Sequence, residues 1–142
     1  MEEATEALVD WAKFARMRSQ LGADFIRILG YFREDGEKSV ERIVDAMNRR
    51  EATALVIPAH TLKTEARQFG ATPLGELAEE IEFVGRRAVE SRLFPDQLLP
   101  QVAQLRSIYQ RTMDLFEQET NPLVARRSAE DRGASNQQFG RL

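Results

Sequence analysis

Apolar residues along the chain recur every three or four positions, and no stretch alternates with the two-residue period of a β-strand. Long helices joined by short loops pack antiparallel to one another. We therefore expect an all-α protein, an up-and-down antiparallel four-helix bundle with an additional short N-terminal helical segment. The pattern predicts helices over residues 11–21, 24–49, 53–69, 73–90 and 95–119.

Residues typical of helix ends support several of these boundaries. Asp10 is a good N-cap for the first helix, Gly70 is a natural C-cap glycine for the third, and Thr72 is a candidate N-cap for the fourth. Gly36 interrupts the second helix, where glycine costs roughly 1 kcal/mol relative to alanine. We interpret Gly36 as a point of close packing or bending within one continuous helix.

The helical pattern stops near Asn121, and the residues that follow are rich in Arg, Ser, Gly and Gln with few apolar side chains. Such a composition is typical of a mobile tail. A chain of 142 residues has room for one hydrophobic core. We therefore expect an N-terminal lead (residues 1–8), one helical domain (9–120) and a disordered tail (121–142).

Composition excludes several classes of function. The 20 Lys and Arg residues are outnumbered by 23 Asp and Glu residues, which disfavours a general nucleic-acid binder. The absence of cysteine excludes disulfides, thiolate metal sites and cysteine nucleophiles. The longest mostly apolar stretch, residues 52–59, is too short to cross a bilayer, and the acidic start does not resemble a secretory signal. We expect a cytoplasmic protein.

The single histidine, His60, must take part in any imidazole chemistry of this chain. On an ideal helix it points roughly 140° away from the apolar seam of its own helix, so we expect it at the surface. An exposed imidazole is largely neutral near pH 7 and leaves one ring nitrogen free to attack. One imidazole with cationic neighbours is a poor site for a divalent metal, and we expect none. The residues expected on the same face are Val56, Ile57, Lys63, Thr64 and Arg67.

This face suits a phosphoryl acceptor. Lys63 and Arg67 would stabilise an anionic group on the imidazole, and apolar residues before His60 could dock the protein that delivers it. The chain has no glycine-rich phosphate loop, so the phosphoryl group must come from a partner. A lone histidine on a helix is nevertheless more often a structural or surface residue.

The segment Ala59-His60-Thr61-Leu62-Lys63, followed by Phe69-Gly70-Ala71, closely resembles the signature of histidine-containing phosphotransfer (HPt) domains. The resemblance covers roughly residues 9–119. It implies that His60 is the phosphorylated histidine, normally modified on Nε2, and that Lys63 lies beside the phosphoryl group. Glu82 falls where members often carry a Gln or Glu that hydrogen-bonds the imidazole. Arg67 matches no strict family requirement and is a candidate on geometry alone.

The resemblance implies a phosphorelay intermediate rather than an enzyme. His60 would accept a phosphoryl group from an aspartate in the receiver domain of a hybrid histidine kinase and pass it to a response-regulator aspartate. The receiver would dock over Val56, Ile57 and Thr64 and supply Mg²⁺, with no cofactor on this chain, which we expect to be a monomer.

Two alternatives stay open from the residues. Thr64 replaces a glycine common in the family, which leaves room for a degenerate HPt-like module that binds receivers without carrying phosphate. A histidine-kinase phosphoacceptor helix is less favoured, because an acidic residue normally follows the histidine there, whereas Thr61 follows here.

Overall fold

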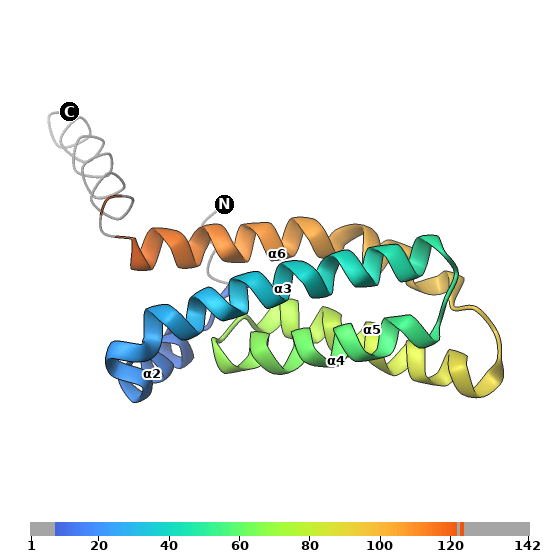
Figure 1. Ribbon diagram of the computed structural model, residues 1–142, viewed down its shortest axis with the longest axis horizontal. Helices are drawn as coiled ribbons and strands as arrows, with labels where there is room; N and C mark the ends of the chain where they lie inside the picture. Colours follow the sequence, from blue (N-terminus) through green and yellow to red (C-terminus); the bar gives the residue numbers. More distant parts are fainter. Residues whose placement is uncertain (1–7, 122, 124–142) are drawn as a thin grey trace, which may run out of the picture.

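The computed structural model describes residues 8–121 and 123, and this part of the chain is helical throughout (Figure 1). The predicted lead and tail therefore fall largely outside the described residues. The α-helices are α2 (Trp11–Leu21), α3 (Phe25–Asn48), α4 (Thr53–Gln68), α5 (Thr72–Ser91) and α6 (Leu99–Thr120). Short 3₁₀ turns, Gly22–Asp24 and Asp96–Leu98, precede α3 and α6.

Helices α3 to α6 form an antiparallel bundle in which each packs against the next, and α6 closes the ring against α3 (Figure 1). Helix α2 lies at one end of the bundle, against α3 and α4. The all-α, up-and-down four-helix bundle with a short helix before it is thereby confirmed.

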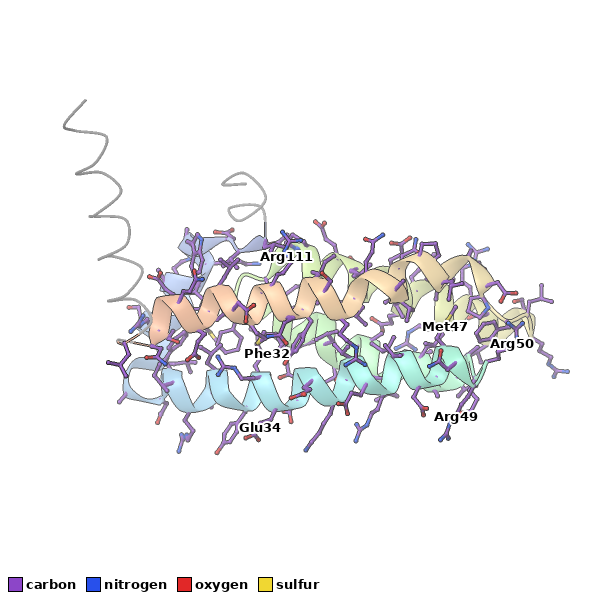
Figure 2. The ribbon with its side chains drawn as sticks, turned by 90° about the horizontal axis from the view of Figure 1, so that it is seen from above. Phe32, Glu34, Met47, Arg49, Arg50 and Arg111 are labelled. Atoms are coloured by element: carbon purple, nitrogen blue, oxygen red, sulfur yellow. The ribbon has the colours of Figure 1, made fainter. Side chains whose placement is uncertain are left out.

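The core follows the predicted apolar seams. Figure 2 shows Phe32 of α3 directed between α3 and α6, whereas Glu34 points away from the bundle. At the α2 end, Phe32 stacks on Phe69 with ring centroids 5.3 Å apart, and Phe14 stacks on Phe116 at 5.0 Å. The seam predicted for α4 is almost completely buried: Leu55, Ala59, Leu62, Ala66 and Phe69 are each at most 1% exposed.

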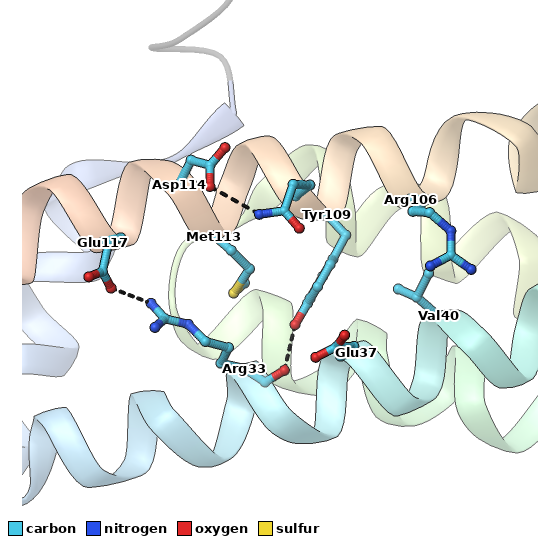
Figure 3. A pocket seen from close by; sticks show the side chains of 9 residues that line it. Arg33, Glu37, Val40, Arg106, Tyr109, Met113, Asp114 and Glu117 are labelled. Carbon is cyan, nitrogen blue, oxygen red and sulfur yellow. Dashed lines mark hydrogen bonds and ion pairs between the residues drawn. The ribbon is translucent and has the colours of Figure 1, made fainter.

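Gly36 lies where α3 and α6 approach each other closely. A Cβ atom at Gly36 would lie 2.7 Å from Cε2 of Tyr109. The Tyr109 ring is buried, and its hydroxyl donates a hydrogen bond to the carbonyl of Arg33 at 2.5 Å (Figure 3). The ring therefore has little freedom to move aside, and the close packing predicted for Gly36 is confirmed.

The stability of two glycine variants on the same helix tests this packing. Gly30 also lies in α3, but a Cβ there meets nothing within 4 Å. We expect Gly30→Ala to raise the free energy of unfolding by about 0.5–1 kcal/mol through helix propensity alone. We expect Gly36→Ala to lower it by about 1–2 kcal/mol, because the steric cost exceeds the same gain. Urea denaturation measures both, and equal shifts would contradict the close packing.

The turn after α4 is hydrogen-bonded to the residue that immediately precedes α2. Gly70 has a φ of +78°, and the N–H of Ala71 reaches back to the carbonyl of Ala66 at 2.9 Å, a common helix C-terminus. The N–H of Asp10 donates to the carbonyl of Gly70 at 2.8 Å. The predicted N-cap is present, since Asp10 Oδ1 accepts from the N–H of Lys13 at 3.1 Å.

Two predicted helix starts are corrected. Thr72 is not the N-cap of α5 but its first residue, because the turn at Gly70 directs that carbonyl toward the N–H of Thr72 at 2.9 Å. The Thr72 hydroxyl also reaches the Gly70 carbonyl and caps nothing. Helix α6 begins at Leu99 rather than near Pro95, because residues 96–98 adopt a tighter 3₁₀ turn.

Candidate functional site

A network of charged groups joins α4 to α5 around His60. The Glu82 side chain on α5 is only 7% exposed, and its Oε2 lies 2.9 Å from Nδ1 of His60. Its other oxygen, Oε1, lies 2.7 Å from Nζ of Lys63. Arg86, one turn further along α5, donates to Oε2 from Nε at 3.1 Å and from Nη2 at 2.8 Å. One buried carboxylate thus contacts three side chains from two helices.

The charge of Glu82 sets the proton position on the imidazole. Burial by itself would raise the pKa of Glu82, but the contacts from Lys63, Arg86 and His60 outweigh burial and lower the pKa to about 2. An ionised carboxylate can only accept hydrogen bonds, so Nδ1 of His60 must carry a proton. In the neutral imidazole the lone pair is then on Nε2. The His60 side chain is 51% exposed, so this nucleophile lies at the surface.

The structure brings His60, Lys63 and Glu82 together and directs Arg67 elsewhere. The Lys63 side chain is 19% exposed and runs to Glu82 in α5. Arg67 forms an ion pair with Glu79 of α5, and its Cγ lies close to Gly75. Its guanidinium is therefore already neutralised by a carboxylate rather than free beside the imidazole.

The three predicted docking residues differ in exposure. Ile57 is 69% exposed, and Thr64 is exposed, with its hydroxyl donating to the carbonyl of His60 at 3.0 Å. The predicted position of Val56 at the surface is wrong, because Val56 is only 9% exposed. Its Cγ2 lies against Gly85 of α5, since α4 packs against α5 as well as α3 and buries a wider arc than its apolar seam.

Sequence reasoning missed Arg86. The signal was present, because Glu82 and Arg86 are four residues apart, the spacing at which oppositely charged side chains on a helix form an ion pair. A carboxylate already paired with Lys63 and hydrogen-bonded to His60 receives a second cation from this spacing. That second cation helps to hold Glu82 ionised.

Glu65, on the α3 side of α4, gives stability a pH dependence of its own. Burial, with a smaller contribution from Asp35, raises the pKa of Glu65 to about 7. The folded state then holds this proton more tightly than the unfolded state, so stability falls as pH rises from about 4.5 to about 7. We expect Glu65→Gln to raise stability at pH 8 by about 1–2 kcal/mol and to leave it unchanged at pH 4. Thermal unfolding at both pH values measures this, and an equal gain at both would contradict the assignment.

A hollow lies between α3 and α6, away from the His60 network (Figure 3). Its volume is about 310 Å³, and its walls carry both charges, with Arg33 paired to Glu117 at 2.9 Å. It contains no residue of α4 or α5 and so does not communicate directly with His60.

The described residues contain neither a membrane-spanning helix nor a cluster of metal ligands. Each helix of residues 8–121 lacks the length or the apolar character that a bilayer span requires. Within residues 8–121 and 123, no three acidic or histidine side chains gather as metal ligands would.

Comparison with known proteins identifies the family. The model of the Hpt domain family matches residues 27–118. The crystal structure of histidine-containing phosphotransfer protein B (HptB) from Pseudomonas aeruginosa PAO1 superimposes with a TM-score of 0.68 at 23% identity, covering 79% of this chain and 93% of that one. No significant match was found among curated proteins. Because the family match spans well over half of the chain and includes the whole His60 network, the protein belongs to the Hpt domain family.

Proposed function

We propose that this protein is a phosphorelay intermediate that carries a phosphoryl group on Nε2 of His60. The group arrives from the phosphorylated aspartate of one receiver domain and leaves to the aspartate of another. The observation that carries this proposal is the hydrogen bond between Nδ1 of His60 and the ionised Glu82. That bond orients the imidazole and leaves the lone pair on Nε2 available to a partner.

The transfer step needs no general base on this chain. The Nε2 lone pair forms the new N–P bond, and the acyl O–P bond breaks with its electron pair leaving to the partner's aspartate. Nε2 carries no proton in this tautomer, so none has to be removed before attack. The imidazole becomes positively charged while Nδ1 keeps its proton, and the Glu82 carboxylate, 2.9 Å away, stabilises that charge.

The cations near His60 have different roles. Lys63 forms an ion pair with Glu82, and its ammonium still has N–H donors to offer to a phosphoryl oxygen. Arg86 is half exposed and shares Glu82 with the imidazole. Its guanidinium can therefore shift toward the phosphoryl oxygens once the group is on His60. Arg67 would need to leave Glu79 to take part, which makes its contribution the smallest of the three.

The partner supplies what this chain does not. We propose that the receiver contributes the Mg²⁺ and most of the transition-state stabilisation, while this protein contributes a positioned nucleophile and no cofactor. In this account the protein is a phosphocarrier rather than an enzyme with its own turnover, and it works as a cytoplasmic monomer. Ile57 and Thr64 form part of the receiver contact, whereas Val56 is buried and does not touch the receiver.

Transfer from a receiver phosphorylated with ³²P, in the presence of Mg²⁺, tests the proposal. We expect acid-labile, base-stable label on the wild type and none on His60→Gln. Binding of both proteins to the receiver, measured by calorimetric titration, is the control for folding. A receiver that binds the wild type but transfers nothing to it would instead support an interaction module that does not carry phosphate. Label that persists on His60→Gln would place the acceptor on another residue.

A further inference from the structure

The α4–α5 hairpin exposes several large apolar side chains. Ile57 of α4 is 69% exposed and Phe83 of α5 is 59% exposed. At the end of the hairpin, Val89 is 42% exposed and Leu93 is 70% exposed. Single exposed apolar residues are ordinary, but a group of them on one face marks an interaction surface.

Phe83 and Ile57 lie on the two helices that form the His60 site. Phe83 directly follows Glu82, the residue that binds Nδ1 of His60, and one helical step turns its side chain about 100° from Glu82 toward solvent. Ile57 precedes His60 by one turn of α4 and is equally outward. Each of the two helices that form the His60 site therefore presents a large apolar side chain to solvent within one turn of the His60–Glu82 contact.

A groove continues from Phe83 toward the end of α5. Its volume is about 400 Å³, and it lies between α5 and the connection to α6, where Leu93 and Phe94 line it. Arg87 also lines the groove, and its guanidinium carbon is 5.8 Å from the centre of the Phe83 ring. An aromatic ring beside a cation and an apolar groove is the composition of a protein–protein hot spot.

We propose that Phe83 is the principal anchor for the receiver domain that exchanges phosphoryl groups with His60, and that the receiver's contact crosses α5 into this groove. This inference rests on the proposed function and adds to it a residue that sets affinity and partner choice. A donor that reaches Nε2 must cover the exposed surface of α4 and α5 beside the His60–Glu82 contact, and Ile57 and Phe83 are large exposed apolar side chains within one turn of these two residues. An acidic partner that carries an acyl phosphate also suits Arg86 and Arg87 beside the ring.

Matched alanine variants test the proposal. Phe83→Ala removes the anchor, and Ile57→Ala removes its counterpart on α4. Ile26→Ala and Tyr31→Ala, both in α3, are the controls, because these residues are 56% and 52% exposed on a helix that does not line the groove. We expect Phe83→Ala to weaken receiver binding about tenfold or more and to slow transfer at low receiver concentration by a similar factor. We expect both controls to remain within about twofold of the wild type.

Phosphorylation by potassium phosphoramidate, which needs no docking surface, separates docking from chemistry. Phe83→Ala should accept this phosphoryl group at the wild-type rate. Receiver binding and transfer by Phe83→Ala equal to the wild type would overturn the anchor while leaving the proposed function intact. A loss that appears equally with phosphoramidate would also overturn it, since the effect would lie in the site or the fold. A wild type that neither binds nor accepts from any receiver would overturn both proposals.

Discussion

Glu82→Ala is expected to be the most destabilising single change at the site, lowering the free energy of unfolding by about 2–4 kcal/mol. The reason is that Lys63, only 19% exposed, would be left with its charge uncompensated, and Arg86 and His60 would lose their common acceptor. The imidazole would also lose the group that fixes its tautomer. We therefore expect transfer from a receiver to slow by about tenfold to a hundredfold. Chemical denaturation and single-turnover transfer measure the two effects.

Glu82→Gln separates charge from shape, because the amide keeps an oxygen that can accept from Nδ1 but carries no charge. The pKa of Glu82 in the folded state, about 2, is below its ordinary value of 4.5. Its charged form therefore stabilises the fold above about pH 4.5, and that contribution is lost as the pH falls toward 2. We expect wild type and Glu82→Gln to differ by about 1–3 kcal/mol at pH 7 and to converge over this range. A difference that does not change with pH would contradict the charge network.

Gly70→Ala is expected to cost about 3 kcal/mol, the largest effect away from the charged network. A residue with a side chain at a φ of +78° is strained, and a Cβ there would lie 2.5 Å from the backbone oxygen of Asp10. That oxygen cannot easily turn away, since it accepts from Phe14 at 3.0 Å while the Asp10 N–H is bound to Gly70. In Gly70→Ala this clash would therefore displace the start of α2 from the turn at Gly70. Trp11 fluorescence reports on α2, because Trp11 is the only tryptophan.

Gly70→Asn is the control for backbone strain. Asparagine tolerates a positive φ better than alanine, but its Cβ meets the same oxygen. We expect both variants to lose similar stability, with the fluorescence transition of Trp11 preceding the loss of helical circular dichroism. Rescue by asparagine would show that strain alone, rather than the contact with Asp10, makes glycine necessary.

The helical framework could be predicted because local signals and packing agree. The seam of α4, the Asp10 cap and the glycine after α4 all occur where spacing and capping rules place them. The predicted N-cap role of Thr72 was wrong, because both its backbone N–H and its hydroxyl donate to the Gly70 carbonyl, which the turn at Gly70 brings close. The sequence alone does not show which carbonyl these two donors reach in the folded chain.

The site was only partly predictable, because it is shared by two helices. A helical wheel places His60 outward on α4 but cannot show that α5 covers Val56 or that Glu79 binds Arg67. The contact between Glu82 and His60 follows from the register of α5 against α4, which only the family resemblance suggested in advance. The packing of two helices, rather than the pattern of either one, determines which polar groups meet.

Phosphorylation of Nε2 of His60 can be observed directly by ¹⁵N NMR of the phosphorylated protein with labelled histidine. His60 is the only histidine, so every phosphohistidine signal belongs to this site. After transfer from a phosphorylated receiver, we expect a phosphoryl group on Nε2 and a proton retained on Nδ1, hydrogen-bonded to Glu82. A phosphoryl group on Nδ1, or an imidazole that stays unmodified while the receiver loses its phosphate, would show that His60 does not accept the group through Nε2.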